Sequence, residues 1–291
     1  MSNATLTLPD GRRLGYADYG DPRGRPVLYC HGLPGSRLEA RWAHEAAAER
    51  GLRLLALERP GYGLSDPLPQ RRLVDWPADV AHAADRLGVE RFTLIGISGG
   101  GPYALACAAR LGPRVEHAVL VCGMGQVERL AHTRGMMWLG RAGLLLARYA
   151  PWLLHAVLAV LFVPLARRHP PALLRLMTWG GPAGDKAALR EPTLRALLCE
   201  AVREGVRQGA GGPLRDLLVY ARPWGFAPED VQVPVTLWHG ARDVTVPAHH
   251  AQRLAARLPH AKLHLLPEHG HFTLPSQLAE RMLDNLLQAH P

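Results

Sequence analysis

Short apolar runs alternate with longer helical patterns along most of this chain of 291 residues. Apolar runs predict strands over 27–30, 54–57, 92–95, 118–121, 235–238 and 262–266. Between them, the spacing of apolar residues predicts helices over 38–50, 76–87, 103–111, 248–258 and 276–289. Strands that alternate with helices predict an α/β fold, in which a largely parallel sheet carries helices on its faces.

The alternation is interrupted in two places. Near the N-terminus, the pattern of Thr5–Leu8, a Pro-Asp-Gly turn and 14–19 predicts an antiparallel hairpin at one edge of the sheet. From 123 to 229 there is no clear strand, and prolines and glycines separate several helical stretches. We therefore expect a core made of residues 1–122 and 230–291, with a helical cap, 123–229, inserted into it.

The basic excess does not indicate a nucleic-acid partner. Lys and Arg number 34 against 25 Asp and Glu, which gives a formal charge of +9. Only two of the basic residues are lysines, and the arginines are scattered rather than gathered in a short run with aromatic residues. We expect a small-molecule partner and no nucleic acid, and the sequence does not indicate an oligomeric state.

The cysteines lack the spacing of a metal site. Cys30, Cys107, Cys122 and Cys199 are far apart in sequence and lie in apolar or alanine-rich stretches, which predicts buried, reduced thiols. The first 16 residues show no charged and then apolar leader. We expect a cytoplasmic protein without a metal or an organic cofactor.

The most apolar region, 143–165, raises the question of a membrane span. Arg148, Pro151, His155 and Pro164 divide it, and its longest uninterrupted stretch, 156–163, is far shorter than the ~20 residues that a span needs. We expect a buried helix or part of a lid rather than a span. Peripheral membrane contact is an open alternative.

A serine stands between a predicted strand and a predicted helix, in the sequence Gly96-Ile97-Ser98-Gly99-Gly100. So sharp a turn strains the serine backbone and makes its hydroxyl project above the sheet, while small neighbours avoid clashes. The following helix N-terminus offers free amides to a developing oxyanion. In a chain with 30 glycines the pattern alone could be a simple glycine-rich turn, so its context must decide.

Serine needs a base, and a third group must orient that base. Among fifteen histidines, His271 follows the last predicted strand, with His269 as its rival. Asp243 is the one acid in the loop after the preceding strand; its alternative role is to cap the next helix, and Glu128 is the fallback acid. Because parallel strands end at the same rim, Ser98, Asp243 and His271 are predicted to converge there.

An oxyanion also needs two amide donors. Gly99 follows the serine and supplies one. The loop after the first parallel strand reads His31-Gly32-Leu33-Pro34, and we expect Leu33 to supply the other, because Pro34 has no N–H. His31 is expected to brace this loop.

These motifs resemble those of the α/β-hydrolase superfamily. The matching pieces, in the family's order, are His31-Gly32, the segment 59–66 (Arg-Pro-Gly-Tyr-Gly-Leu-Ser-Asp), the Ser98 turn, 240–243 and 270–272. The resemblance implies an eight-stranded sheet with a cap between strands six and seven. It also separates this chain from relatives that carry aspartate at the serine position, the epoxide hydrolases and haloalkane dehalogenases.

The resemblance implies an enzyme that hydrolyses an ester, lactone or thioester through an acyl-enzyme. An amidase or aminopeptidase and a carbon-carbon bond hydrolase remain alternatives on the same residues, as do a lyase and a non-catalytic ligand-binding protein. The cap candidates for an apolar substrate pocket are Met137, Trp138, Trp179 and Trp224. Packing between cap and core is the alternative role of these four side chains.

Overall fold

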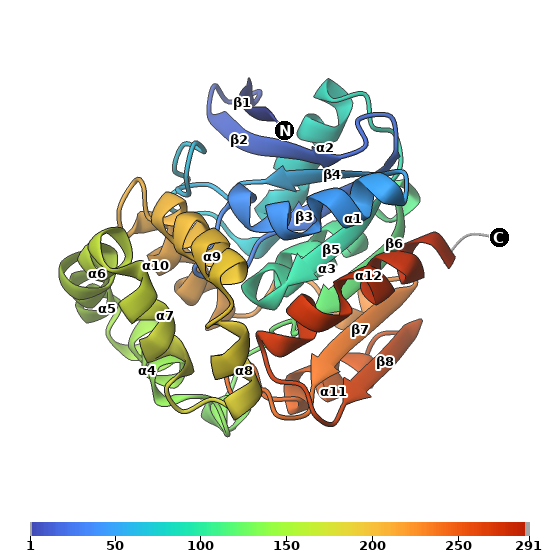
Figure 1. Cartoon of the computed structure of the whole chain (residues 1–291). Coiled ribbons are helices and arrows are strands. Elements are labelled where there is room, and N and C mark those ends of the chain that lie inside the picture. The colour runs from blue at the N-terminus through green and yellow to red at the C-terminus, as the bar shows by residue number, and fades with distance from the viewer. Residues whose placement is uncertain (1, 289–291) are drawn as a thin grey trace.

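The computed structural model describes residues 2–288, and its centre is one eight-stranded sheet in the order β1-β2-β4-β3-β5-β6-β7-β8 (Figure 1). Strand β2 pairs antiparallel with β1 and β4, and all other neighbours are parallel. The strands are β1 (Ser2–Thr7), β2 (Arg13–Gly20), β3 (Arg25–Cys30), β4 (Leu52–Leu57), β5 (Phe92–Ile97), β6 (Val115–Val121), β7 (Val235–Gly240) and β8 (Ala261–Leu266). The predicted α/β class, its hairpin edge and the eight strands are confirmed.

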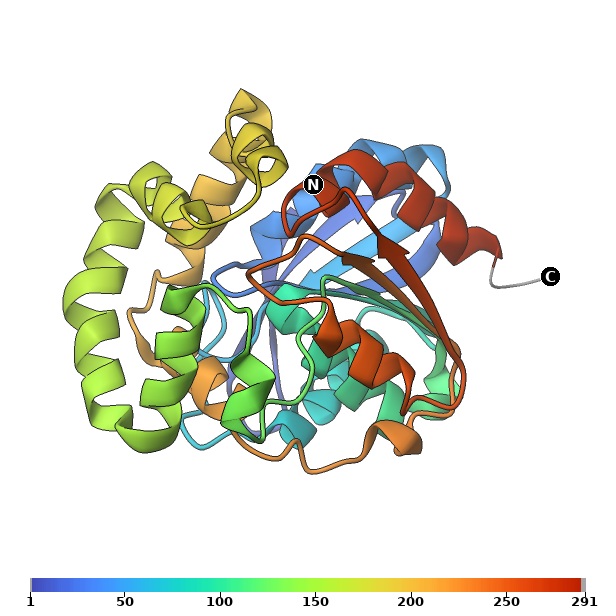
Figure 2. The same cartoon turned by 90° about the horizontal axis from the view of Figure 1, so that it is seen from below.

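Helices cover both faces of the sheet (Figure 2). One face carries α1 (His44–Glu49) and α12 (Thr273–Gln288), and the other carries α2 (Trp76–Arg86), α3 (Gly101–Arg110) and α11 (His249–Ala255). Residue 289, the last of the predicted C-terminal helix, lies outside the described residues. Short 3-10 turns complete the core: η1 (Arg37–Ala43), η2 (Leu73–Asp75), η3 (Ser98–Gly100), η4 (Gly112–Arg114) and η7 (Pro228–Asp230).

Strand residues alternate between two buried clusters, as the period of two along a strand requires. On β4, for example, Leu54 belongs to the cluster that includes residues of α1 and α12, whereas Leu55 belongs to the cluster that includes residues of α2 and α3. Because both faces of the central strands are buried, these strands are apolar throughout, which is why short apolar runs revealed them.

The segment between β6 and β7 contains helices and no strand among the described residues. It forms a second layer beside the sheet (Figures 1 and 2). Its elements are η5 (Leu130–Thr133), α4 (Trp138–Tyr149), α5 (Pro151–Val157), the π-helical turn η6 (Leu158–Phe162), α6 (Val163–Arg168), α7 (Pro170–Thr178), α8 (Ala183–Ala188), α9 (Pro192–Gly205) and α10 (Gly211–Tyr220). We call residues 123–229 the cap.

Of the two expectations for the apolar region 143–165, the buried helix is wrong, whereas its position in the cap agrees with part of a lid. Helices α5, η6 and α6 form a continuous run of 18 residues, Pro151–Arg168, of which 22% are buried, so it is neither a short nor a buried helix. Pro164 does not end it. A proline ring collides with the carbonyl four residues earlier, here that of Val160, and Val160 lies inside the wider π-helical turn, which accommodates the ring.

Candidate active site

Ser98 occupies a strained backbone position at the end of β5. Its φ is +52°, a left-handed value that costs a non-glycine residue roughly 1–2 kcal/mol. The turn is tight enough that a Cβ on Gly100 would lie 2.0 Å from the carbonyl oxygen of Cys30. Glycine at this position therefore permits the close approach of β3 that holds the serine above the sheet.

The structure brings Ser98, His271 and Asp243 together at the carboxyl ends of β5, β8 and β7. Ser98 Oγ lies 3.0 Å from Nε2 of His271, and Nδ1 of the same ring lies 2.7 Å from Oδ2 of Asp243. All three side chains are buried. Because Asp243 can only accept, Nδ1 carries the proton and Nε2 is free to accept the proton of the serine.

The second oxygen of Asp243 fixes the direction of its carboxylate. Oδ1 accepts hydrogen bonds from the amides of Thr245 and Val246, both at 2.8 Å. Helix α11 begins only at His249, so Asp243 does not cap it. The alternative role of Asp243 as a helix cap is therefore wrong.

Burial and the neighbouring charges have opposite effects on the pKa values of His271 and Asp243. Burial lowers the pKa of His271, but the adjacent Asp243 carboxylate outweighs burial, and the pKa is raised. Burial in turn raises the pKa of Asp243, and the interaction with His271 reverses this, so that its pKa is lowered. The pair is arranged to stabilise an imidazolium beside a carboxylate.

The alternative base, His269, and the alternative acid, Glu128, do not join this group. His269 is half-buried, and its carbonyl oxygen accepts from the amide of Arg242. Glu128 is exposed, and Arg148 donates to its backbone oxygen. Neither side chain has a hydrogen bond to Ser98 or His271 in the described part of the chain.

Cys122 approaches Asp243 and His271 closely enough for the three side chains to be tested as a metal site. Burial raises the pKa of the Cys122 thiol well above its ordinary value, which disfavours the thiolate that a metal binds. The 2.7 Å contact between His271 and Asp243 also occupies the atoms that a metal would need. These residues fit a hydrogen-bonded relay and not a metal centre.

The two residues predicted to supply the oxyanion amides, Leu33 and Gly99, line the apolar side of the site together with Ser98. The amide of Leu33 has no hydrogen-bond acceptor among residues 2–288, and Gly99, the second residue of η3, has no preceding helical carbonyl to bond. A Cβ on Gly99 would lie 3.2 Å from that of Leu33, so the two loops are neighbours.

Sequence reasoning missed two side chains that hold these loops. Tyr220, from α10 of the cap, donates to the carbonyl oxygen of Gly99 at 2.7 Å. The buried carboxylate of Glu39 accepts from the amide of Gly32, at 3.1 and 3.2 Å, and from Tyr29. Tyr220 reaches Gly99 across 121 positions, and Glu39 bonds Gly32 seven residues earlier outside any of the motifs considered.

His31 braces the loop that contains Leu33, as expected. Its Nε2 accepts from the amide of Arg59 at 3.3 Å, and its Nδ1 donates to the carbonyl of Gly32 at 2.9 Å. Burial and the nearby charge of Arg59 lower the pKa of His31 well below its usual value. It is therefore a neutral, structural histidine.

Two cavities meet at Ser98. One, of about 630 Å³, lies between the oxyanion loop, α9 and the His271 loop, and includes Glu39, Trp42 and Thr193. The other, of about 480 Å³, lies under α4–α6 and is lined mostly by apolar residues, above all Leu and Met. Both volumes are typical of small-molecule sites.

The structure separates the four cap candidates for the apolar pocket. Met137 and Trp138 line the apolar cavity. Trp179 is 68% exposed and lines neither cavity. Trp224 is buried and stacks on Phe226, so it packs the interior, which was the alternative role.

A cap carboxylate holds the loop that carries His271. Asp185, in α8, is 2% exposed and accepts hydrogen bonds from three consecutive amides, His271 at 2.8 Å, Phe272 at 3.0 Å and Thr273 at 2.9 Å. These amides lie at the N-terminus of helix α12, where the first N–H groups have no carbonyl of the helix to bond and need another acceptor. The signal in the sequence was that Asp185 is the first acid after a long acid-free stretch of the cap.

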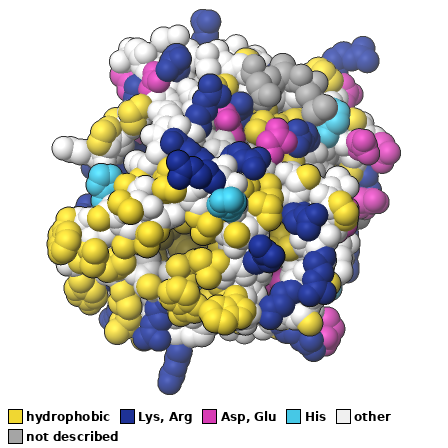
Figure 3. Space-filling model, turned by 60° about the vertical axis from the view of Figure 1, so that its left-hand side comes forward, with side chains coloured by type: hydrophobic (Ala, Val, Ile, Leu, Met, Phe, Trp, Pro, Cys, Tyr) yellow, Lys and Arg dark blue, Asp and Glu magenta, His cyan; other side chains and the backbone are white. Residues whose placement is uncertain are grey.

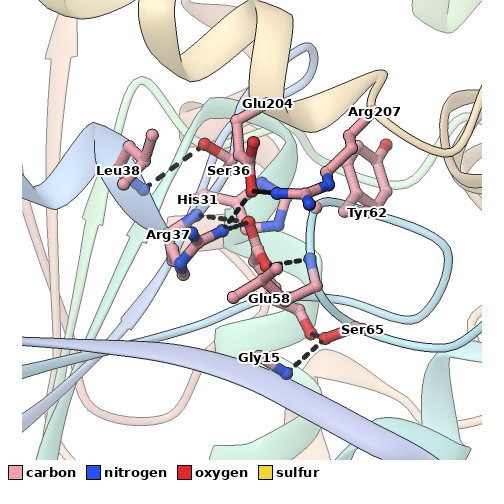
Figure 4. A network of polar contacts seen from close by, with 12 residues as sticks. Gly15, His31, Ser36, Arg37, Leu38, Glu58, Tyr62, Ser65, Glu204 and Arg207 are labelled. Carbon is pink, nitrogen blue, oxygen red and sulfur yellow. Dashed lines mark hydrogen bonds and ion pairs between the residues drawn. The ribbon is translucent and has the colours of Figure 1, made fainter. Parts of the chain in front are cut away.

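Two more cap carboxylates bind arginines of the core. Glu204, in α9, lies 2.7 Å from Arg37, which also contacts Glu58 at 2.7 Å (Figure 4). Asp216, in α10, accepts from Arg59 and Arg71.

Asp216 is the centre of a fully buried network. Tyr62 and Tyr103 also donate to it, at 2.7 and 2.6 Å. Burial would raise the pKa of Asp216, but the two arginines lower it to about 2. With Asp185 and Glu204, this side chain fixes α8–α10 over the strand ends that carry Ser98, Asp243 and His271.

Comparison with known proteins agrees with this architecture. Residues 25–276 match the family model described as alpha/beta hydrolase fold. In structure, the chain is similar to the enol-lactonase from Burkholderia xenovorans LB400 (TM-score 0.72, 17% identity, 98% of this chain and 99% of that one). It is also similar to an esterase from Exiguobacterium antarcticum (TM-score 0.70, 18% identity, 99% and 98%). At these identities the likeness concerns the fold.

Curated proteins match over a shorter region. A non-heme chloroperoxidase of Streptomyces lividans is 35% identical over 127 residues, which is 42% of this chain and 45% of that protein. A proline iminopeptidase of Xanthomonas citri is 33% identical over 110 residues, 36% of this chain and 34% of that protein. The chain thus aligns with less than half the length of these relatives.

Proposed function

Because this chain belongs to the α/β-hydrolase fold family, we propose that it is a serine hydrolase that cleaves an ester-type bond of an apolar small molecule. One observation carries the proposal: Ser98 Oγ lies 3.0 Å from His271 Nε2, whose ring is bound to Asp243, at the point where the two cavities meet. A hydroxyl, a base and an orienting carboxylate in this order are the requirements of acyl transfer.

In the proposed reaction, Ser98 Oγ attacks the carbonyl carbon while Nε2 of His271 takes the hydroxyl proton. Asp243 stabilises the resulting imidazolium, and the amides of Leu33 and Gly99 stabilise the oxyanion. The alcohol then leaves with the proton from His271, and Ser98 keeps the acyl group. A water molecule, deprotonated by the same nitrogen, releases the acid and restores the serine.

The lining of the cavities supports an apolar ester. The apolar cavity offers an acyl chain contact with Leu146, Leu158 and Phe162 and few polar groups. The more polar cavity, with Glu39 and Thr193, suits the leaving alcohol. Compared with the nitrogen of an amide or the carbon of a carbon-carbon bond, the alcohol of an ester needs less help to leave.

The test is replacement of the nucleophile. We expect Ser98→Ala to abolish hydrolysis of p-nitrophenyl butyrate and labelling by a fluorophosphonate, and the wild type to show an acyl adduct at Ser98 by mass spectrometry. Ser276→Ala is the matched control, because Ser276 lines the same cavity but its hydroxyl bonds only the carbonyl of Thr273 in the described structure. Undiminished activity in Ser98→Ala would contradict the proposal.

A substrate panel separates the alternatives on the same residues. Esters, lactones and dipeptide amides distinguish an esterase from an amidase or aminopeptidase. A lyase would turn over its substrate without an acyl adduct, and a ligand-binding protein would be labelled at Ser98 without turning over any ester. The amides belong in the panel because of the partial similarity to a proline iminopeptidase.

A further inference from the structure

The cap exposes large apolar side chains that the proposed reaction does not use. Of the nine most exposed large apolar residues among those described, all but Leu265 lie in the cap. Six of them belong to helices α4–α6 and their π-helical turn, and we call the five that are more than half exposed the cap face: Trp138, Tyr149, Trp152, Val160 and Leu161, which are 58%, 70%, 75%, 68% and 64% exposed. Figure 3 shows apolar side chains gathered over the cap. An exposed apolar surface of this kind marks an interaction site.

The helix Pro151–Arg168 carries much of this face, and it lies on the cap rather than apart from it. Leu154, Leu158 and Val163 anchor its inner side, while Trp152 and Val160 point outward. Arg167 fixes its end by donating to the carbonyl of Val206. A helix held in this way can lie in a lipid interface but is not free to cross one.

The part of the cap that carries this face, residues 129–184, has charged side chains of one sign only. Residues 129–184 contain seven arginines and no Asp, Glu or Lys. All seven arginines are exposed, and none forms a salt bridge with a carboxylate in the described part of the chain. The acids of the cap that bind the core, Asp185, Glu204 and Asp216, all lie beyond this segment, so residues 129–184 present arginines and no acid at their surface.

The apolar cavity reaches the cap face. Trp138 and Leu161 line that cavity and are also more than half exposed, so they stand at its mouth. Figure 3 shows a hollow within the apolar surface. The same cavity extends inward to Ser98. A continuous apolar path therefore leads from the cap face to the serine.

We propose that the cap face docks on an anionic lipid surface, from which an acyl ester reaches Ser98 through the apolar cavity. The apolar side chains would enter the interface, and the arginines would contact the lipid phosphates. Charge argues against a second copy of this chain, because two such segments would bring together arginines that have no carboxylate partner in the described structure. The docking stands without the proposed function, whereas the delivery of an ester rests on it.

The test measures sedimentation of the full chain with vesicles of phosphatidylcholine alone and of equal parts phosphatidylcholine and phosphatidylserine. We expect binding to the second kind, weakened by salt. Trp152→Glu with Val160→Glu should abolish binding, since both side chains are exposed and neither lines a cavity. Arg141→Gln with Arg168→Gln should weaken binding about fivefold or more, from the attraction of each arginine to an anionic surface.

The matched control removes two charges from the core instead. Arg23 and Arg86 are exposed outside the cap, so Arg23→Gln with Arg86→Gln should bind like the wild type. Equal weakening by this control, or no sedimentation of the wild type with either vesicle, would overturn the docking proposal. So would a dimer, seen by size-exclusion chromatography, that Trp152→Glu with Val160→Glu makes monomeric.

Hydrolysis of soluble p-nitrophenyl butyrate separates this proposal from the proposed function. Both double variants, of Trp152 with Val160 and of Arg141 with Arg168, should keep that activity, because none of the four side chains lines a cavity that contains Ser98. A chain that binds vesicles but cleaves no ester would support the docking and contradict the proposed hydrolase. A chain that cleaves the ester but binds no vesicle would support the hydrolase and contradict the docking.

Discussion

Replacement of Asp185 by Asn tests whether the cap positions the base. One oxygen of Asp185 accepts from Phe272 and Thr273, and the other accepts from the amide of His271 at 2.8 Å. Asparagine keeps the shape and one oxygen, but its NH2 group would face an N–H group, either that of His271 or those of Phe272 and Thr273. The variant therefore loses at least one hydrogen bond to a charged acceptor, at a cost of about 1.5–3 kcal/mol.

This cost should appear in turnover rather than in substrate binding. Asp185 lines neither cavity, so KM should stay within about twofold. A loss of about 2 kcal/mol in the placement of His271 corresponds to a decrease of roughly 30-fold in kcat. Asp230→Asn is the matched control, because Asp230 also accepts a backbone amide in the cap region, that of Ala227, but on an exposed turn.

The pH profile distinguishes positioning from mere stabilisation. The base must be neutral to accept the proton, so kcat/KM falls as the pH drops below the pKa of His271. Asp185 is one of the charges that raise this pKa, and removing it should move the acidic limb of the profile to lower pH. Steady-state kinetics on p-nitrophenyl butyrate across pH, with urea unfolding in parallel, measure both effects. An unchanged kcat and an unmoved acidic limb would refute the reasoning.

Three further changes test other parts of the site. Asp243→Asn should reduce kcat about 10⁴-fold, since the imidazole loses the partner that fixes its tautomer, and it should move the acidic limb to lower pH, because Asp243 is the main group that opposes the lowering of the His271 pKa by burial; kinetics across pH measure both. Asp216→Asn should lower the free energy of unfolding by about 3–5 kcal/mol, because two buried arginines lose their counterion; urea unfolding measures this, with Asp230→Asn as control. Gly143→Leu should lower kcat/KM for an octanoyl ester about tenfold or more and leave the acetyl ester unchanged, because Gly143 lines the apolar cavity; the ratio of the two esters measures it.

Each of these three has an outcome that contradicts it. A kcat of Asp243→Asn close to that of the wild type would mean that another group orients His271. Unchanged stability of Asp216→Asn would mean that the arginines find other acceptors. Equal losses on both esters in Gly143→Leu would mean that the acyl chain does not enter the apolar cavity.

The site residues that directly follow a strand could be predicted from the sequence. Ser98, Asp243 and His271 each follow an apolar run, and the geometry of a parallel sheet places the ends of such runs on one rim. The structure places these side chains within hydrogen-bonding distance. Leu33 could be chosen on the sequence because its neighbour, Pro34, has no N–H.

The cap was harder to predict, because its contacts join residues far apart in sequence. Asp216 and Arg59 meet across 157 positions, and no local pattern links them. Trp224 and Trp179 have the same residue type, but one is buried and the other is exposed, which depends on tertiary packing alone. Pro164 indicated a helix end, and only the local π-helical turn let the helix continue.

The three cap carboxylates that contact the core, Asp185, Glu204 and Asp216, also limit how the cap can be removed or exchanged by protein engineering. A chain in which residue 122 is joined directly to residue 230 would leave Arg59 and Arg71 without Asp216, and the amides of 271–273 without Asp185. Uncompensated buried charge costs several kcal/mol, against a total stability of about 5–15 kcal/mol. Transplanting a cap from a relative in order to change specificity would therefore have to carry acids at these three places.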